Sequence, residues 1–531
     1  MSRRLLAAGI AALCVLTLSA TTASAGPAAS GPASVDPASI GSAGDWPTWT
    51  KDLSGSRFNG SEHRITPATV GNLKLKWAFS YPAIPGSSPH SQPAVADGAL
   101  YFGGDDGKFY SVDAKSGATR WTFTLPSNAL VQDGASVAAG RVYFGDTQGT
   151  VRALDQRTGR LLWQFQTDAT PLSVVTSSPI FFEGHIFVGT SSGQNTGDQN
   201  AACCTFRGHV DAIDAATGKL SWRYYTVPPP QQVGTWPSGA ARYEPSGAGV
   251  WSSPVVDQRT HTLYVGTGQN YTGHGGDFDT LLALNTSSGQ VRWKQQVTPD
   301  DTWRSLCNDP QSADGYCPVP QGTALDWDLG ATPNLFTVNG RELVGIGQKA
   351  GFYHVFDAHT GQVVWRRQLS TPMPNGGLSG IQWGTSFDGK HLYVATMMGD
   401  PGILYALDPA TGAELWHTPN PADGCTTGGA AQSPDLCTPS FIPAVTTSPG
   451  LVYEGSADGK MRVFDSKTGK VLWTYDTVRD FDGVNGLPGF GGAISGGGGA
   501  VVADGMVYVQ TGYWMAPYPS DRGHALLAFG L

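Results

Sequence analysis

The sequence of 531 residues predicts an all-β fold, an eight-bladed β-propeller in which strands from the two ends of the chain complete the last blade. Three observations predict it. A strand–turn–strand unit recurs seven times, each copy ends in a tryptophan, and incomplete copies lie at both ends of the chain. Repeats of this length that contain hairpins are typical of propeller blades, so a single domain can account for most of the chain.

The repeat unit is clear in its first complete copy, "GALYFGGDDGKFYSVDAKSGATRW". Each copy has an alternating apolar strand, an Asp or Asn, a turn that ends in Gly, and a Trp four residues after that Gly. Alternation with Asp-x-x-x-Gly turns favours antiparallel hairpins over helices. We expect the Gly to serve the turn and the Trp to pack between neighbouring blades. The repeat tryptophans are Trp121, Trp163, Trp222, Trp293, Trp365, Trp416 and Trp473.

The eighth blade is predicted from the two ends of the chain. The C-terminal segments "DGMVYVQTGY" and "GHALLAFGL" supply inner strands but no outer strand with a Trp. Near the N-terminus, "VGNLKLKWAFSY" supplies an orphan strand that contains Trp77. Joining these segments closes the ring and removes the open edges that a linear array would expose. A closed propeller needs no partner subunit for stability, so we expect a monomer.

The segment before the repeats predicts export from the cytoplasm. Residues 1–25 have a basic start, an apolar run and a small-residue cleavage pattern, which is typical of a secretory signal peptide and too short for a membrane anchor. Residues 26–45 form a linker rich in Gly, Ala, Ser and Pro, and residues 46–531 form the propeller domain. We therefore expect a secreted or extracytoplasmic protein without a membrane span.

Charge and cysteine spacing exclude several classes of partner and cofactor. The formal net charge is −9, which gives no electrostatic footprint for nucleic acid. No cysteine lies in a CxxC or CxxCH motif, so neither a thiolate zinc site nor a covalent haem is predicted.

Six cysteines follow the signal peptide. Four of them bracket two short polar loops and predict the disulfides Cys307–Cys317 and Cys425–Cys437 in an oxidising compartment. The other two, Cys203 and Cys204, are adjacent, and a bond between them would close a cramped ring. The alternative is that each pairs elsewhere or stays reduced.

The repeat resembles the W-motif of the pyrroloquinoline quinone (PQQ) dehydrogenases, and the similarity runs from about Trp46 to the C-terminus. The opening "DWPTWTKDLSGSRFNG" resembles the N-terminal signature of that superfamily. Three further segments resemble the polyvinyl-alcohol dehydrogenase branch: "CCTFRG" at 203–208, "GQKAG" at 347–351 and "GIQWG" at 380–384. The resemblance implies an eight-bladed quinoprotein that oxidises alcohols.

The resemblance also implies a cofactor site. PQQ would lie between a disulfide of Cys203 with Cys204 and the indole ring of Trp251. The other implied cofactor-binding residues are Thr176, Ser191, Arg207, Lys349 and Trp383. Hydroxyl groups and a guanidinium suit the carboxylates of the cofactor, and a lysine would stabilise negative charge on the quinone oxygens during reduction.

The segment "DWDLGATP" resembles the family segment that holds the catalytic aspartate. Asp326 aligns best, and Asp328 is the second choice because residues two apart on a strand point the same way. The chemistry needs a carboxylate that accepts the alcohol proton while a hydride leaves the same carbon for the quinone.

Family enzymes hold Ca²⁺ beside the quinone with a Glu, an Asn and the catalytic Asp. The positions implied here are Gln194, Gln269, Asn270 and Asp326. Gln194 stands where the family has the Glu, and an amide in place of a carboxylate weakens the hold on a divalent cation. Two more departures are His90, in place of an early Glu, and Gly249, in place of a Thr. Calcium is therefore a weak prediction.

Three functions follow from these patterns. The first is a secreted quinoprotein dehydrogenase that oxidises secondary alcohols, with polyvinyl alcohol as one candidate, and passes electrons to an external acceptor such as cytochrome c. The second is a non-catalytic propeller that serves as an extracytoplasmic scaffold or binds a polymer or peptide, which the departures favour. The third is a carbohydrate- or polymer-binding module that uses exposed aromatic residues such as Trp236, Tyr243 and Tyr513.

Overall fold

The structure is a computed structural model. It describes residues 42–82, 90–126, 129–307, 315–320, 322–373, 379–397, 401–421, 424–432, 435, 437–494, 496–512 and 523–531. The predicted signal peptide (1–25), the linker up to residue 41 and Tyr513 lie outside the described residues. Within these ranges, no helix is long and apolar enough to cross a membrane.

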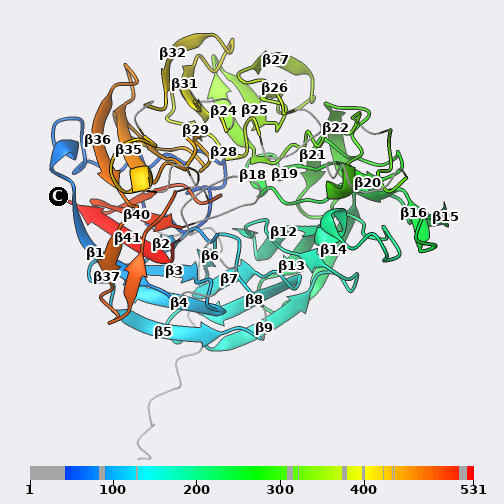
Figure 1. The fold of residues 1–531 in the computed structure, drawn as a ribbon, viewed down its shortest axis with the longest axis horizontal. Coiled ribbons are helices and arrows are strands. Elements are labelled where there is room, and N and C mark those ends of the chain that lie inside the picture. The colour runs from blue at the N-terminus through cyan, green and yellow to red at the C-terminus, as the bar shows by residue number, and fades with distance from the viewer. Residues whose placement is uncertain are drawn as a thin grey trace, which may run out of the picture. The chain divides into compact units, whose positions relative to one another are not determined.

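Eight antiparallel sheets, seven with four strands and one with five, form the blades (Figure 1). The first contains β2 (Ala94–Ala96), β3 (Ala99–Gly103), β4 (Lys108–Asp113) and β5 (Thr119–Thr124). The second contains β6 (Ser136–Ala138), β7 (Arg141–Gly145), β8 (Thr150–Asp155) and β9 (Leu161–Gln166). The third contains β11 (Ile180–Phe182), β12 (His185–Ser192), β13 (His209–Asp214) and β14 (Leu220–Tyr225), and β10 (Ser173–Val174) also pairs with β12. The fourth contains β18 (Val255–Asp257), β19 (Thr262–Gly266), β21 (Thr280–Asn285) and β22 (Val291–Gln296).

The remaining blades follow the same order. The fifth contains β24 (Asn334–Val338), β25 (Arg341–Gly347), β26 (Phe352–Asp357) and β27 (Val363–Gln368). The sixth contains β29 (Ser386–Phe387), β30 (Leu392–Ala395), β31 (Ile403–Leu407) and β32 (Glu414–Pro419). The seventh contains β33 (Thr446–Ser448), β34 (Leu451–Gly455), β35 (Lys460–Asp465) and β36 (Val471–Asp476). The eighth contains β39 (Val501–Ala503), β40 (Met506–Thr511), β41 (Ala525–Gly530) and β1 (Lys74–Ser80).

The eighth blade confirms the predicted closure. Its outer strand β1 comes from the N-terminal part of the chain and pairs antiparallel with β41, with Ala78 opposite Leu527. The predicted all-β, eight-bladed propeller is therefore confirmed. In most blades the first three strands are mostly buried, whereas the fourth, such as β5, alternates between exposed and half-buried residues. In the eighth blade, the outer strand β1 is buried from Trp77 to Ser80. The core therefore lies between the blades, and the repeat tryptophans cover it from the outside.

The repeat tryptophans join neighbouring blades as predicted. Trp121 donates its indole N–H to the backbone carbonyl of Gln156 in the next blade at 3.0 Å, and its ring covers Gly159. A Cβ on Gly159 would lie 2.5 Å from this ring, and its φ of +71° is a left-handed conformation that favours glycine. At the closure, Trp77 covers Gly117 of the first blade in the same way. The Gly therefore serves both the turn and the contact between blades.

Short two-stranded pairs and 3-10 turns lie in the segments outside the blade sheets. Two-stranded pairs are formed by β15 (Gln231–Thr235) with β16 (Ala241–Glu244), β17 (Ser246–Gly247) with β20 (Asn270–Thr272), β23 (Ala331–Thr332) with β28 (Trp383–Gly384) and β37 (Asp480–Asp482) with β38 (Pro488–Phe490). The 3-10 turns are η1 (Val70–Asn72), η2 (Gly193–Thr196), η3 (Ser305–Cys307) and η4 (Gly429–Gln432). The disulfides Cys203–Cys204, Cys307–Cys317 and Cys425–Cys437 are all present.

Candidate active site

Loops from successive blades meet in a cavity of about 290 Å³ at one end of the ring. Two kinds of loop contribute, those that enter the first strand of a blade and those that follow the second strand. The predicted residues among its lining are Thr176, Ser191, Trp251, Gln269, Asp328, Lys349 and Trp383. The structure therefore brings most of the implied cofactor-binding residues together, although they are up to 207 residues apart in the sequence (383 minus 176).

Lys349 is the central charge of this cavity. Its ammonium Nζ lies 2.9 Å from Oδ1 of Asp326 and 2.7 Å from Oδ2 of Asp328, and 5.3 Å from the centre of the Trp251 ring. Burial by itself lowers the pKa of Lys349, but the charges and hydrogen bonds of the two aspartates outweigh it and hold the pKa above its usual value. Lys349 is therefore a cation at neutral pH.

The two candidate bases occupy different positions. Asp328 lines the cavity, and its carboxylate accepts hydrogen bonds from Trp251 Nε1 at 3.1 Å and from the backbone N–H of Gln269 at 2.5 Å. Asp326 is equally buried but is absent from the described lining. Burial raises the pKa of Asp326 to about 8, and Asp328 adds to this shift while Lys349 opposes it. The second choice of the sequence prediction is thus the carboxylate that faces the cavity.

Asp301, which sequence reasoning missed, holds the backbone of the segment that carries Asp326. Its fully buried carboxylate accepts the backbone N–H of Asp326 at 2.9 Å and that of Trp327 at 2.5 Å. Burial raises its pKa to about 6, with a further contribution from the charge of Asp328. Burial also raises the pKa of the neighbouring Asp279, and the charge of Asp301 raises it further. Burial and the charges of neighbouring carboxylates thus raise the pKa values of Asp279, Asp301 and Asp326 together.

Aromatic rings and small residues form the rest of the wall. The rings of Trp251 and Trp383 meet edge to face, with centroids 5.4 Å apart. A Cβ on Gly249 would lie 2.6 Å from the hydroxyl of Ser191 and 3.1 Å from that of Tyr271. Glycine in place of the family Thr therefore leaves room for these two hydroxyl groups. Tyr271 was missed by sequence reasoning, and so was Gln132, which precedes its blade as Thr176 does in the next.

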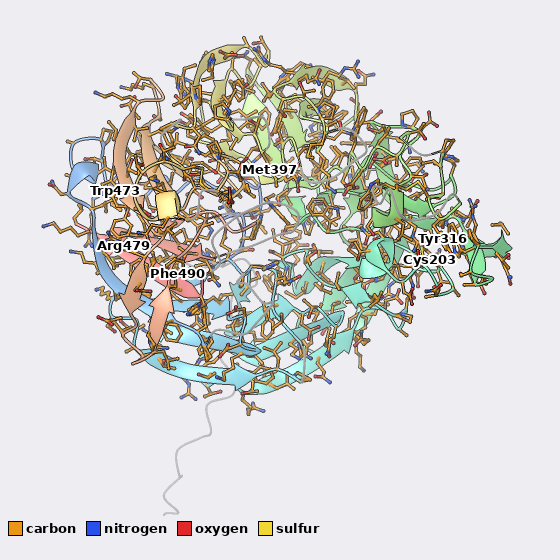
Figure 2. All side chains as sticks on the ribbon, viewed as in Figure 1. Cys203, Tyr316, Met397, Trp473, Arg479 and Phe490 are labelled. Atoms are coloured by element: carbon orange, nitrogen blue, oxygen red, sulfur yellow. A yellow bond between two sulfur atoms is a disulfide. The ribbon has the colours of Figure 1, made fainter. Side chains whose placement is uncertain are left out.

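The adjacent disulfide, which the resemblance places against the cofactor, is not among the described residues that line this cavity. Cys203 and Cys204 are 4% and 0% exposed and pack with Phe206 and Tyr271. The turn η2 lies against them, since the carbonyl oxygen of Gln194 is 3.7 Å and 4.0 Å from the two sulfur atoms. Figure 2 shows Cys203 on the side of the ring that carries the β15–β16 hairpin, with which it forms a bridge at Arg242. The disulfide therefore supports the cavity wall from behind.

Arg207, for which the resemblance implies a contact with the cofactor, is also not among the described residues that line this cavity. Its Nε donates to the carbonyl of Val227 at 2.9 Å, and its guanidinium carbon lies 3.6 Å from the centre of the Tyr225 ring. The side chain therefore packs on the outer strand of its own blade, where the guanidinium stacks on the aromatic face of Tyr225.

The implied calcium ligands do not converge. The side-chain oxygen of Gln194 accepts the backbone N–H groups of Thr205 and Phe206, at 2.9 Å and 3.0 Å, and so binds the segment that follows the cysteines. The amide of Asn270 donates to two glycine carbonyls, and Asp326 is paired with Lys349. No cluster of three or more His, Cys, Asp or Glu that could hold a metal ion occurs in the described part of the chain. The donor set therefore does not fit Ca²⁺, and we derive no step through a metal ion.

The two described aromatic residues of the third hypothesis, Trp236 and Tyr243, are not fully exposed. Trp236 is only 2% exposed, and its indole N–H donates to the carbonyl of Cys203 at 2.9 Å. Tyr243 is half-buried. Trp236 thus helps to fix the hairpin against the adjacent disulfide. The prediction that it is exposed is wrong.

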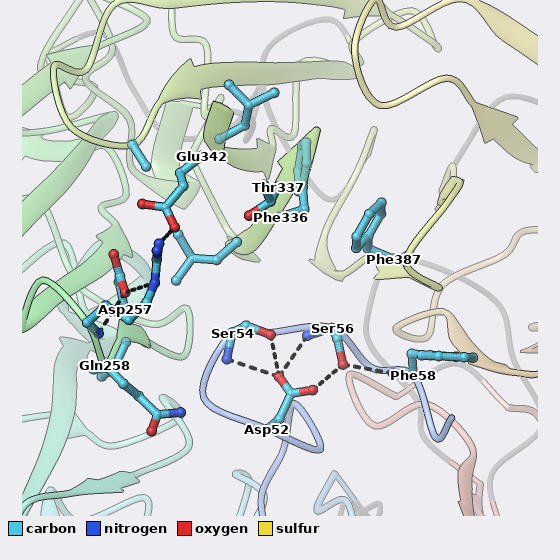
Figure 3. A pocket seen from close by; sticks show the side chains of 16 residues that line it. Asp52, Ser54, Ser56, Phe58, Asp257, Gln258, Phe336, Thr337, Glu342 and Phe387 are labelled. Carbon is cyan, nitrogen blue, oxygen red and sulfur yellow. Dashed lines mark hydrogen bonds and ion pairs between the residues drawn. The ribbon is translucent and has the colours of Figure 1, made fainter. Parts of the chain in front are cut away.

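A larger depression of about 630 Å³ lies at the other end of the blades, among turns that join first and second strands (Figure 3). Its polar groups are paired with one another: the carboxylate of Asp52 accepts from Ser54 and Ser56, and Arg259 contacts Glu342. None of the residues predicted to bind the cofactor or to act in catalysis lines it. The smaller cavity is therefore the candidate active site.

Comparison with known proteins identifies the family and the fold. The family described as "Outer membrane protein assembly factor BamB" matches residues 48–238, 207–317 and 353–516. The polyvinylalcohol dehydrogenases of Pseudomonas sp. and Sphingopyxis sp. (strain 113P3) are both 34% identical, over 88% and 89% of this chain and 73% of each of those proteins. A solved quinohemoprotein alcohol dehydrogenase from Pseudomonas putida HK5 has a TM-score of 0.66 at 20% identity, covers 92% of this chain and 80% of its own, and supports the fold.

The propeller fold together with the polyvinylalcohol dehydrogenase relatives identifies the class as a quinoprotein dehydrogenase. The chain belongs to the PQQ-dependent alcohol dehydrogenase superfamily, in the branch that includes polyvinylalcohol dehydrogenase. The enzyme class predicted from the sequence, a PQQ-dependent alcohol oxidoreductase, is thereby confirmed.

Proposed function

We propose that the protein is a secreted quinoprotein dehydrogenase that oxidises secondary alcohols, polyvinyl alcohol among them, to ketones. The observation that carries the proposal is the Lys349 ammonium, held between two aspartates at the wall of a cavity that Trp251 also lines. PQQ, when bound, supplies a planar quinone that accepts a hydride. The residues present fit such a group, since Trp251 offers an aromatic face, Lys349 a cation, and Thr176 and Ser191 hydroxyl groups for its carboxylates.

Asp328 is the proposed catalytic base. It lines the cavity, its carboxylate accepts hydrogen bonds from Trp251 and Gln269, and it lies beside the Lys349 ammonium. It can accept the proton of the substrate hydroxyl as the carbonyl forms. Lys349 stays charged and stabilises negative charge that develops in the cavity. Asp326, whose pKa is raised to about 8 chiefly by burial, can hold a proton behind the cavity wall.

The setting of the reaction is proposed from the sequence. The signal-peptide pattern supports an extracytoplasmic location, and the lack of a CxxCH motif supports transfer of electrons to an external acceptor such as cytochrome c. We also propose that the protein is a monomer.

A non-catalytic propeller is the second candidate. Two observations favour it: Arg207 lies on Tyr225 and not at the cavity, and the disulfide is covered by η2. Such a protein would use the same fold to bind a peptide or a polymer.

A PQQ titration of the purified, oxidised mature protein tests the proposal, with and without Ca²⁺, followed by dye reduction on addition of a secondary alcohol. We expect saturable binding, turnover, and loss of both in Lys349→Ala. Full binding without turnover would contradict the dehydrogenase, and no binding would favour the second candidate. Equal activity in calcium-free buffer is expected from the position of Gln194.

A further inference from the structure

The size of the cavity limits what can enter it. About 290 Å³ is at the lower end of the range for small-molecule sites, roughly 300–1,000 Å³, and the cofactor must share this space. If the substrate is a polymer, only the reacting carbinol unit can enter, and the neighbouring chain must lie on the rim. The rim therefore has to provide any further recognition of a long substrate. This inference rests on the proposed function.

One wall of the cavity continues outward to such a rim. Strand β10 pairs with the end of β12, so that Val174 lies opposite Ser191, and both residues line the cavity. Leu172 directly precedes β10, and its carbonyl accepts the N–H of Gly193, the first residue of η2, at 2.8 Å. Its side chain borders η2, because a Cβ on Gly193 would lie 3.7 Å from the Cβ of Leu172. Leu172 thus stands at the outer edge of the wall that contains Ser191.

Two properties of Leu172 disfavour it as a purely structural residue. Its side chain is 57% exposed, among the most exposed large apolar side chains in the described residues. Its φ is +65°, a left-handed conformation that leucine rarely adopts and that glycine or asparagine adopts more readily. An exposed apolar side chain on a strained backbone costs stability. Such residues concentrate at functional sites, where the strain serves a contact made in function.

We propose that Leu172 is a specificity-determining contact of the substrate site, which binds the hydrocarbon backbone of a long-chain secondary alcohol outside the cavity. The methylene groups next to the reacting carbon pack on the leucine side chain and remove it from water. The hydroxyl that reacts enters the cavity on the side of Ser191 and Lys349. The rim then favours a polymer with alternating methylene and hydroxyl-bearing carbons over a short alcohol.

Leu172→Asn tests this proposal, since asparagine accepts the left-handed backbone and removes the apolar surface. Leu415→Asn is the matched control, because Leu415 is 49% exposed on the outer strand β32. Binding of polyvinyl alcohol to each purified protein is measured by titration calorimetry without any electron acceptor. Dye-linked kinetics with polyvinyl alcohol and with isopropanol are measured separately after addition of PQQ.

We expect Leu172→Asn to weaken polymer binding about fivefold, the change that loss of one leucine contact implies. The ratio of kcat/KM for the polymer to that for isopropanol should fall by a similar factor. The melting temperature should be equal to or above that of the wild type, and Leu415→Asn should change neither binding nor the ratio. Equal polymer binding by wild type and Leu172→Asn, including no binding by either, overturns the inference. If the wild type reduces no dye but Leu172→Asn still weakens polymer binding, the proposal that Leu172 contacts the polymer is retained and the dehydrogenase proposal fails.

Discussion

The buried lysine of the cavity allows a sharp stability prediction. Lys349→Met keeps most of the side-chain volume but removes the ammonium that lies 2.9 Å and 2.7 Å from Asp326 and Asp328. At such distances the attraction to one charged carboxylate is worth about 6 kcal/mol at an effective dielectric constant of about 20, and desolvation of the ammonium offsets much of this. Removing one partner of a buried ion pair leaves the other uncompensated. We therefore expect the free energy of unfolding to fall by roughly 3–5 kcal/mol at neutral pH.

The loss should depend on pH with a defined sign. Burial raises the pKa of Asp326 from 3.8 to about 8 even though Lys349 lowers it, so the pKa should rise further in the variant. A carboxyl whose pKa is higher in the folded state binds its proton more tightly there. Its stability contribution is full below the unfolded pKa and is lost as the pH rises through the folded pKa. The deficit of Lys349→Met should therefore be smaller at about pH 5 than at about pH 8.

Urea unfolding followed by tryptophan fluorescence measures this deficit. Lys108→Met is the matched control, since Lys108 lies at the same 2.9 Å from Asp106 but its side chain is 38% exposed. That variant should lose only about 0.2–1 kcal/mol. Adding Asp326→Asn to Lys349→Met should recover part of the loss. Equal losses for the two lysine variants, or a deficit that shrinks as the pH rises, would refute the reasoning.

Three further pairs of variants test the site and the fold. Asp328→Asn should lower kcat by about 10²–10⁴-fold and Asp326→Asn by much less, measured by dye reduction; the reverse order would restore the first choice of the sequence alignment. Gly159→Ala should destabilise by roughly 2–4 kcal/mol in urea, because a Cβ there meets the tryptophan of the preceding blade. Gly140→Ala, with the same φ of +71° and no atom within 4 Å, should lose only about 1–2 kcal/mol, and equal losses would disprove the blade contact. Gln194→Ala should lower the melting temperature by leaving two backbone N–H groups without their acceptor, each worth about 1–3 kcal/mol, whereas Gln194→Glu should retain it.

The sequence by itself determined the architecture. Each blade is built from hairpins between residues close in the chain, so the alternating pattern, the turn and the tryptophan could be read locally. Closure by strand β1 followed from the incomplete copies at the two ends, and the pairing of Ala78 with Leu527 confirms it. Trp251 and Lys349 were also found from sequence, because they lie in short motifs that the resemblance covers.

The tertiary structure decided which of these residues share the cavity. Asp326 and Asp328 would point the same way only on an extended strand, but φ at Asp326 is +57°, so the strand alternation fails there. Arg207 and the disulfide are held away from the cavity by Tyr225 and by η2, contacts that no local pattern encodes. Asp301 was missed because its carboxylate accepts hydrogen bonds from the backbone N–H groups of residues that lie 25 and 26 positions later in the sequence. In loops outside the repeat, the direction of a side chain depends on packing between distant segments, and only the folded chain fixes it.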